Sequence, residues 1–95
     1  MKLWIDDIRP APAGWVWAKT SGMALSILND YHVDEISFDH DLGGEDTAYP
    51  VACFIEEQAY GGVNNKMIWH IHSANPVGVK NIRSAMENAD KYWHK

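Results

Sequence analysis

Short apolar runs and longer amphipathic segments alternate along the chain. The apolar runs cover residues 3–5, 15–19, 35–38 and 67–72, and each has the length and the aromatic or β-branched content of a strand. Apolar residues recur at helical spacing in the segments that follow the last three runs. The resulting order is strand, strand, helix, strand, helix, strand, helix. It predicts an α/β fold with a largely parallel sheet and right-handed crossovers.

Polar residues and glycines mark the expected ends of the three helices. The apolar helical positions lie within 23–28, 51–59 and 79–93. A proline stands near the start of the second and third helices, where a missing N–H is tolerated, and two glycines end the second. The expected N-terminal caps are Thr20 or Ser21, then Asp46 or Thr47, and then Asn75.

The connection between the first two strands departs from this pattern. A parallel crossover normally needs a dozen or more residues, and the segment 8–14 is too short for a helix. Either the segment crosses in extended form, or the second strand pairs irregularly. At ~3.3 Å per residue an extended segment can just return along a short strand. We therefore expect an extended crossover.

Length and composition are those of one ordinary globular domain spanning residues 1–95. The chain is 46% hydrophobic and 22% charged, and no repeat or linker divides it. The N-terminal apolar run is followed at once by Asp6 and Asp7, so neither a signal peptide nor a membrane span is expected. The single cysteine, Cys53, excludes an internal disulfide and is expected to be buried. These features predict a cytoplasmic protein.

The charge balance limits the partners. The formal net charge is −5, whereas a protein that binds duplex DNA needs a basic stripe that releases counterions from phosphates. A nucleotide or an RNA end is still compatible with this charge. Nine of the thirteen acidic residues lie between Asp30 and Glu57, and no Lys or Arg occurs between Lys19 and Lys66. The middle of the chain is therefore suited to bind a cation.

Acidic residues follow the first and third expected strands. In an open α/β sheet the ligand site lies beyond the carboxyl ends of the strands, so Asp6 and Asp7 should converge with Asp39. Carboxylates from neighbouring strands repel one another unless a divalent ion or a proton lies between them. Oxygen-only ligation suits Mg²⁺, and Mn²⁺ fits similarly. Asp6 and Asp7 alone are equally consistent with a solvated turn, and Asp41 is expected to be a turn or cap residue.

Three histidines lie at or near these strand ends. His72 is nearest to the end of the fourth strand, where a neutral imidazole can act as a general acid or base near pH 7. His40 is ambiguous from its position alone. His70 shares a sheet face with His72, but neither a cysteine nor a third histidine is placed to complete a zinc site. We expect His70 to be a hydrogen-bonded core residue.

Arg9, Ser73 and Asn75 are candidates for binding a phosphate. Arg9 can clamp a phosphate with its guanidinium or form a surface ion pair with Asp7. Ser73 and Asn75 precede a helix, where they form either a small anion site or a plain cap. The tryptophans expected to pack in the core are those at positions 15, 17 and 69, although one near the site can stack on a base.

Three motifs occur in a fixed order along the chain. They are IDD followed by Arg9-Pro10, then FDHDLG, and then HSANP. With them the chain resembles the cyclic-phosphate processing receiver family (cREC), a branch of the response-regulator receiver fold. The resemblance covers nearly the whole chain. It implies a reduced receiver-like, flavodoxin-like three-layer sandwich with about four mostly parallel strands and three helices.

The same resemblance implies roles for the polar residues. It places the receiver's metal-binding acids at Asp6 and Asp7 and its phosphoacceptor position at Asp39. An ordinary receiver also has a fifth strand ending in a lysine that contacts the acyl phosphate, and a helix after the first strand; neither is found here. This difference favours a metal-assisted phosphoesterase-like site over phosphorelay signalling. The further matches are Ser73, as the phosphate-sensing hydroxyl, and His40, His72 and Asn75.

The first of three hypotheses is an enzyme that processes a cyclic phosphate on a nucleotide or at an RNA end. Asp6, Asp7 and Asp39 would hold Mg²⁺, and Asp39 can alternatively be the nucleophile. The second hypothesis is a non-catalytic receiver-like module, an inhibitor or adaptor that binds a protein through its acidic face. The third is a true phosphoacceptor. In the enzyme, Arg9, Ser73 and Asn75 would position the phosphate, and His72 or His40 would protonate the departing ribose oxygen.

Overall fold

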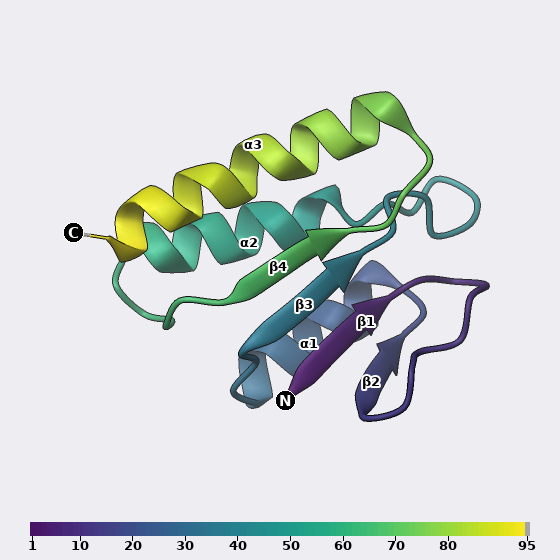
Figure 1. The fold of residues 1–95 in the computed structure, drawn as a ribbon, viewed down its shortest axis with the longest axis horizontal. Helices are drawn as coiled ribbons and strands as arrows, with labels where there is room; N and C mark the ends of the chain where they lie inside the picture. Colours follow the sequence, from purple (N-terminus) through teal and green to yellow (C-terminus); the bar gives the residue numbers. More distant parts are fainter. Residues whose placement is uncertain (95) are drawn as a thin grey trace.

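Four strands form one parallel sheet in the computed structural model, which describes residues 1–94. Their order across the sheet is β2-β1-β3-β4 (Figure 1). Three helices accompany the sheet. The predicted α/β fold with four strands and three helices is therefore confirmed, with elements β1 (Lys2–Ile5), β2 (Trp15–Ala18), α1 (Ser21–Asp30), β3 (Glu35–Phe38), α2 (Tyr49–Tyr60), β4 (Ile68–Ile71) and α3 (Pro76–Trp93).

Two of the three expected helix caps are confirmed. The Thr20 hydroxyl accepts a hydrogen bond from the amide of Met23, and the Asn75 side chain accepts from two amides in the first turn of α3. The prediction for α2 is wrong, because Ala48 stands at its N-cap position and gives no side-chain cap. Asp46 instead accepts hydrogen bonds from the amide and hydroxyl of Ser21, so it supports the start of α1.

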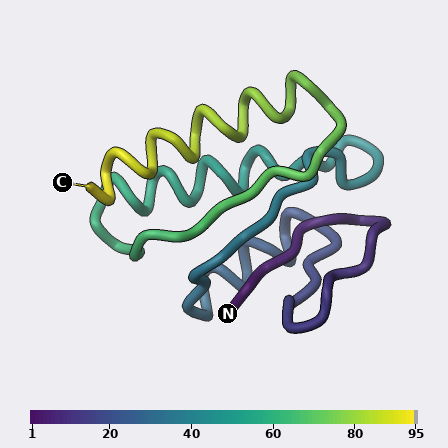
Figure 2. Tube along the Cα trace, in the orientation of Figure 1, coloured from purple at the N-terminus to yellow at the C-terminus, as the bar shows by residue number. Residues whose placement is uncertain are grey.

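The predicted extended crossover is also confirmed. β2 pairs parallel with β1, and residues 8–14 connect them without a helix (Figure 2). The amide of Trp15 donates to the carbonyl of Pro12 in the turn before β2. Gly14 adopts φ 86° there, a left-handed conformation that glycine takes without steric cost.

One face of the sheet carries the aliphatic core. Leu3, Ile5, Ile36 and Phe38 are each 0% exposed on this face. The connections β2 to β3 and β3 to β4 run in the same direction across the sheet, so right-handed crossovers place α1 and α2 on the same side. Figure 1 shows both helices behind the strands, with α3 packed along α2.

The opposite face, which we call the open face, is not covered by any helix of residues 1–94. It carries the side chains that alternate with the core residues. The third layer implied by the resemblance is therefore not seen, because the short 8–14 connection replaces a helix there. The alternating register assigns to the open face Lys2 and Trp4 of β1, Trp15 and Trp17 of β2, Glu35 and Ser37 of β3, and Ile68 and His70 of β4.

Several expectations about burial change with this arrangement. Of the three tryptophans expected in the core, Trp69 packs against it, whereas Trp15 and Trp17 lie half-buried on the open face. The expectation for His70 is wrong, since its side chain is exposed and its Nε2 lies 2.8 Å from Glu35. Cys53 is half-buried rather than buried. Among the described residues, no helix is long and apolar enough to cross a bilayer.

Candidate functional site

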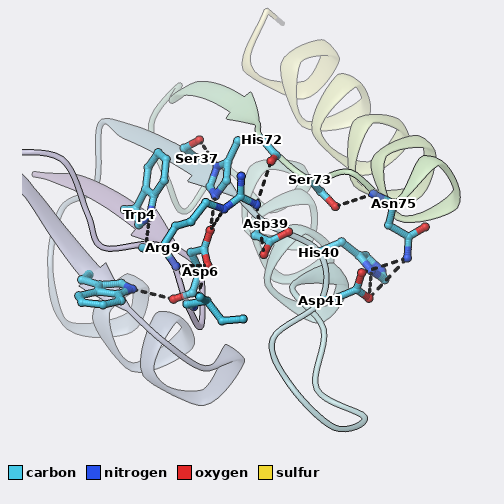
Figure 3. Close-up of polar contacts among 12 residues, drawn as sticks. Trp4, Asp6, Arg9, Ser37, Asp39, His40, Asp41, His72, Ser73 and Asn75 are labelled. Atoms are coloured by element: carbon cyan, nitrogen blue, oxygen red, sulfur yellow. Dashed lines mark hydrogen bonds and ion pairs between the residues drawn. The ribbon is translucent and has the colours of Figure 1, made fainter.

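The carboxyl ends of β1, β3 and β4 bring polar side chains together, as expected for an open α/β sheet (Figure 3). Asp6 and Asp7 follow β1, Asp39 follows β3 and His72 follows β4. Carboxylate oxygens of the three acids all lie within 4.8 Å of one another. The sequence-predicted acid cluster is thus assembled by the fold.

Asp6 is the most deeply placed of these acids and is 0% exposed. Its Oδ1 accepts from the amides of Ile8, at 2.9 Å, and Arg9, at 2.8 Å. Its Oδ2 lies 3.0 Å from Arg9 Nε and 3.1 Å from His72 Nε2. Burial raises the pKa of Asp6, but the two backbone amides, His72 and Arg9 together outweigh it and leave the pKa below its ordinary value. Asp6 is therefore an ionised, fully hydrogen-bonded carboxylate near neutral pH.

Arg9 supplies the positive charge that the acid cluster requires. Its guanidinium joins Asp6 to Asp39, which lies 3.7 Å from Nη2, and the same nitrogen donates to the carbonyl of His72. We expected an ion or a proton between the carboxylates, but the Arg9 guanidinium already offsets part of their repulsion. The expected alternative partner of Arg9 was Asp7, and the ion pair forms with Asp6 instead. Arg9 is 56% exposed, so its side chain can still rearrange around a ligand.

Asp7 contrasts with Asp6. Within residues 1–94 its carboxylate has no hydrogen-bond or ion-pair partner, and its Oδ2 faces Gly43, where an added Cβ would lie 3.4 Å away. The donor set is all oxygen and fits a hard divalent cation. Asp7 and Asp39 have the most accessible oxygens for such an ion, because those of Asp6 already accept three hydrogen bonds and form an ion pair with Arg9. An ion there would compete with Arg9 for the same negative charge.

His72 is held from three sides. The Ser37 hydroxyl lies 2.7 Å from Nδ1, Asp6 is bonded at Nε2, and the indole of Trp4 stacks on the imidazole at 3.9 Å between ring centroids. An ionised carboxylate only accepts, so neutral His72 donates a hydrogen bond from Nε2 to Asp6 and accepts one from the Ser37 hydroxyl at Nδ1. Burial lowers the pKa of His72 despite the opposing effect of Asp6. His72 is therefore neutral near pH 7.

Ser37 and Trp4 were missed as site residues by sequence reasoning. Both lie on the open face, one within β3 and the other within β1. Ser37 is a single hydroxyl in the otherwise apolar end of the strand EISF, and it is only 3% exposed. A small polar residue in a buried strand needs a hydrogen-bond partner, which was the available signal.

His40 belongs to a separate group at the start of α3. Its Nδ1 lies 3.1 Å from Asp41, which also accepts from the Asn75 amide nitrogen. The expectation that Asp41 acts as a turn or cap residue is thus not met; it holds these two side chains. The imidazole packs so closely on Gly78 that a Cβ there would lie 2.2 Å from it. Only glycine at position 78 allows this contact.

The N-terminus of α3 is a filled cap. The side-chain oxygen of Asn75 accepts from the amides of Val77 and Gly78, and the Ser73 oxygen accepts from the amide of Asn75. These amides are therefore not available to an anion. The hydroxyl hydrogen of Ser73 is a donor that this segment can offer to a phosphate.

A shallow depression of about 510 Å³ opens beside these groups. It is lined by five of the predicted site residues, whereas Asp6, His40 and His72 lie outside its lining. A second cavity, of about 270 Å³, lies toward the other end of the sheet and has no Asp, Glu, Lys or Arg in its lining. The two cavities thus differ in the charge of their linings. The five predicted residues in the first are Asp7, Arg9, Asp39, Ser73 and Asn75.

Comparison with known proteins places this arrangement in a family. The model of the cyclic-phosphate processing receiver domain matches residues 1–88, so the chain belongs to that family and has the receiver-like fold. Searches of curated proteins and of solved structures gave no significant match. The family name connects the domain with cyclic phosphates.

Proposed function

We propose that this protein processes a cyclic phosphate, on a nucleotide or at an RNA end, in a phosphoesterase-like reaction that depends on Mg²⁺ or Mn²⁺. The observation that carries the proposal is the convergence of Asp6, Asp7 and Asp39, with oxygens within 4.8 Å of one another, next to Arg9 and beside the depression. A cation and a guanidinium that lie side by side can bind oxygens of the same phosphate.

The phosphate is bound by Arg9 and Ser73 in this proposal. Arg9 Nη1 has no partner among residues 1–94 and the side chain is largely exposed, so the guanidinium can turn one edge to the anion. The Ser73 hydroxyl supplies a second donor. Asn75, predicted as a third contact, has its amide nitrogen on Asp41 and its oxygen on the α3 amides. We therefore assign it the task of holding Asp41 and the start of α3.

In the reaction, a water oxygen bonds to phosphorus, the ring P–O bond breaks, and a proton passes to the departing ribose oxygen. A divalent ion held by Asp7, Asp39 and Asp6 would neutralise phosphoryl charge and lower the pKa of a bound water. His40 is available to move the proton, because its Nε2 has no hydrogen-bond partner in residues 1–94. His72 has both nitrogens engaged, so it can donate only after its bond to Asp6 breaks.

The test is hydrolysis of 2′,3′-cyclic nucleotides with Mg²⁺ or Mn²⁺ by wild type, Asp39→Asn and Asp7→Asn. We expect each substitution to lower kcat/KM by about 100-fold or more, the scale of losing charge stabilisation at a phosphoryl centre. Asp30→Asn is the matched control, because Asp30 lies at the far end of α1. Hydrolysis at the full rate in Asp39→Asn would show that the assignment is wrong.

Two alternatives make different predictions. A protein-binding module that uses the acidic face would capture its partner even when Asp6, Asp7 and Asp39 are all changed to Asn. A phosphoacceptor would form a stable adduct with beryllofluoride at Asp39.

The cytoplasmic location predicted from the sequence belongs with the proposal, since nucleotides and RNA ends are intracellular substrates.

A further inference from the structure

The open face is rich in aromatic side chains. Trp4, Trp15 and Trp17 lie on two adjacent strands, and the rings of Trp4 and Trp15 meet edge to face at 6.0 Å between centroids. All three are half-buried, and no helix of residues 1–94 covers them. Planar rings on an uncovered sheet are surfaces on which nucleic acid bases stack.

Positive charge accompanies these rings. Lys19 Nζ lies 4.4 Å from the centroid of the Trp17 ring, and Lys2 Nζ lies 5.8 Å from that of Trp15. Residues 1–29 contain three basic residues and only two acids, whereas nine of the thirteen acids lie between 30 and 57. On the open side Lys2 also lies 3.9 Å from Glu35, whereas Lys19 has no acidic partner among residues 1–94. Ammonium groups beside aromatic rings can bind phosphates while the rings bind bases.

The composition of the open face favours a nucleic acid strand over a protein helix. Its large exposed aliphatic residue is Ile68, which is 59% exposed and lies at the far edge on β4. A groove for an amphipathic helix is typically lined by aliphatic side chains as well. Here three tryptophans on two adjacent strands are the main apolar surface, which matches single-stranded nucleic acid.

Trp4, Trp15 and Trp17, which we call the aromatic strip, are continuous with the candidate site. The Trp4 ring stacks on His72 with an interplanar angle of 6°, and Trp17 Nε1 donates to the carbonyl of Asp6 (Figure 3 labels Trp4, His72 and Asp6). Trp17 pairs with Trp4, two residues before Asp6 along β1, and Trp15 pairs with Lys2, four residues before Asp6. At ~3.3 Å per residue these are separations of about 7 Å and about 13 Å. A base next to the reacting phosphate can reach Trp17, and reaching Trp15 requires a further nucleotide.

We propose that the open face binds the bases of a single-stranded RNA whose 3′-terminal phosphate lies in the depression. The proposal rests on the proposed function for the position of that phosphate. The terminal base stacks near Trp17 and the preceding one on Trp15. Lys19 and Lys2 move from the ring faces to the phosphates between them. Read from 5′ to 3′, the RNA therefore runs from the amino edge of the sheet toward its carboxyl edge.

The experiment measures the affinity of uridine 3′-monophosphate and of tetrauridylate with a 3′-phosphate, by competition against a labelled tetranucleotide. We expect wild type to bind the tetranucleotide at least 10-fold more tightly than the mononucleotide. Trp15→Ala should lower tetranucleotide affinity by about 5- to 150-fold, the effect of losing one base–aromatic stack. Trp15→Phe keeps a ring and should retain most of the affinity, which guards against a variant that merely unfolds.

Ile68→Ala is the matched control, because Ile68 lies on the same face but outside the aromatic strip. It should keep the preference for the tetranucleotide. Equal affinity for both lengths in wild type, or an unchanged preference in Trp15→Ala, overturns the proposal and leaves the face to a protein partner. If the preference depends on Trp15 but no cyclic phosphate is processed, the proposed function fails and the RNA-binding face stands. If hydrolysis requires Asp39 but the protein shows no length preference, the proposed function stands and the RNA-binding face fails.

Discussion

The two faces of the sheet are built from alternate residues of the same strands, yet they differ in polarity and, over β1 and β3, largely in burial. On the covered face Leu3, Ile5, Ile36 and Phe38 are completely buried. On the open face the tryptophans are half-buried, and polar groups pair with one another, as Glu35 does with Lys2 and His70. One face thus supplies the stability of the fold, and the other presents side chains to ligands.

The largest expected effect is on stability and separates the two faces directly. Phe38→Ala removes a completely buried ring from the covered face and should lower the free energy of unfolding by about 3 to 5 kcal/mol. Ile68→Ala on the open face should change it by less than about 0.5 kcal/mol, because Ile68 is largely exposed. Urea denaturation of both variants measures the difference. Similar losses would mean that the open face is also a packed interface.

A smaller effect is expected at the polar edge shared with the open side. Arg9→Gln removes the guanidinium that joins Asp6 to Asp39, so a divalent cation should bind more tightly, by about 5-fold for a partly exposed charge. Calorimetric titration with Mn²⁺ measures this affinity. Arg9→Lys, which keeps the charge, is the control and should bind like wild type. Weaker binding in Arg9→Gln would show that Arg9 organises the acids rather than competing with the ion.

The smallest effect is a pH dependence that originates on the open side. The pKa of His72 is lowered in the fold, so the unfolded chain takes up this proton first and stability should fall as the pH drops below 6.5. The lowered pKa of Asp6 acts in a separate range: its contribution is present above 3.8 and is lost as the pH falls through the folded pKa. Urea denaturation between pH 5 and 8 tests the first range. His72→Gln should flatten the profile there, and an unchanged slope in this variant would contradict the prediction.

Prediction from the sequence succeeded where local patterns decide the structure. Residues 35–38 were predicted and are observed as β3, and the cap of α1 is Thr20 as expected. The prediction for the start of α2 was wrong because the Asp46 carboxylate, which could cap a helix, accepts a hydrogen bond from Ser21, 25 residues away in the chain. Propensity identifies a capping residue but not the helix that it caps.

The open face was the main feature that the sequence alone did not reveal, although a signal was present. Segments KLWI and WVWA alternate between two kinds of side chain, which is typical of strands with only one buried face. Reading the tryptophans as core residues hid this alternation. A tryptophan is large enough to be half-buried on an uncovered sheet, so hydrophobicity did not decide its face.

The sequence by itself determined the order of the elements, the family and the acids at the strand ends, because these depend on local spacing and on motifs. Only the tertiary structure decided how the groups share their charges. Arg9 lies between Asp6 and Asp39, and Ser37 and Trp4 hold His72, through contacts that span up to 68 residues of chain and depend on strand register. Such contacts follow from how the strands pack side by side, and no local pattern along the chain encodes them.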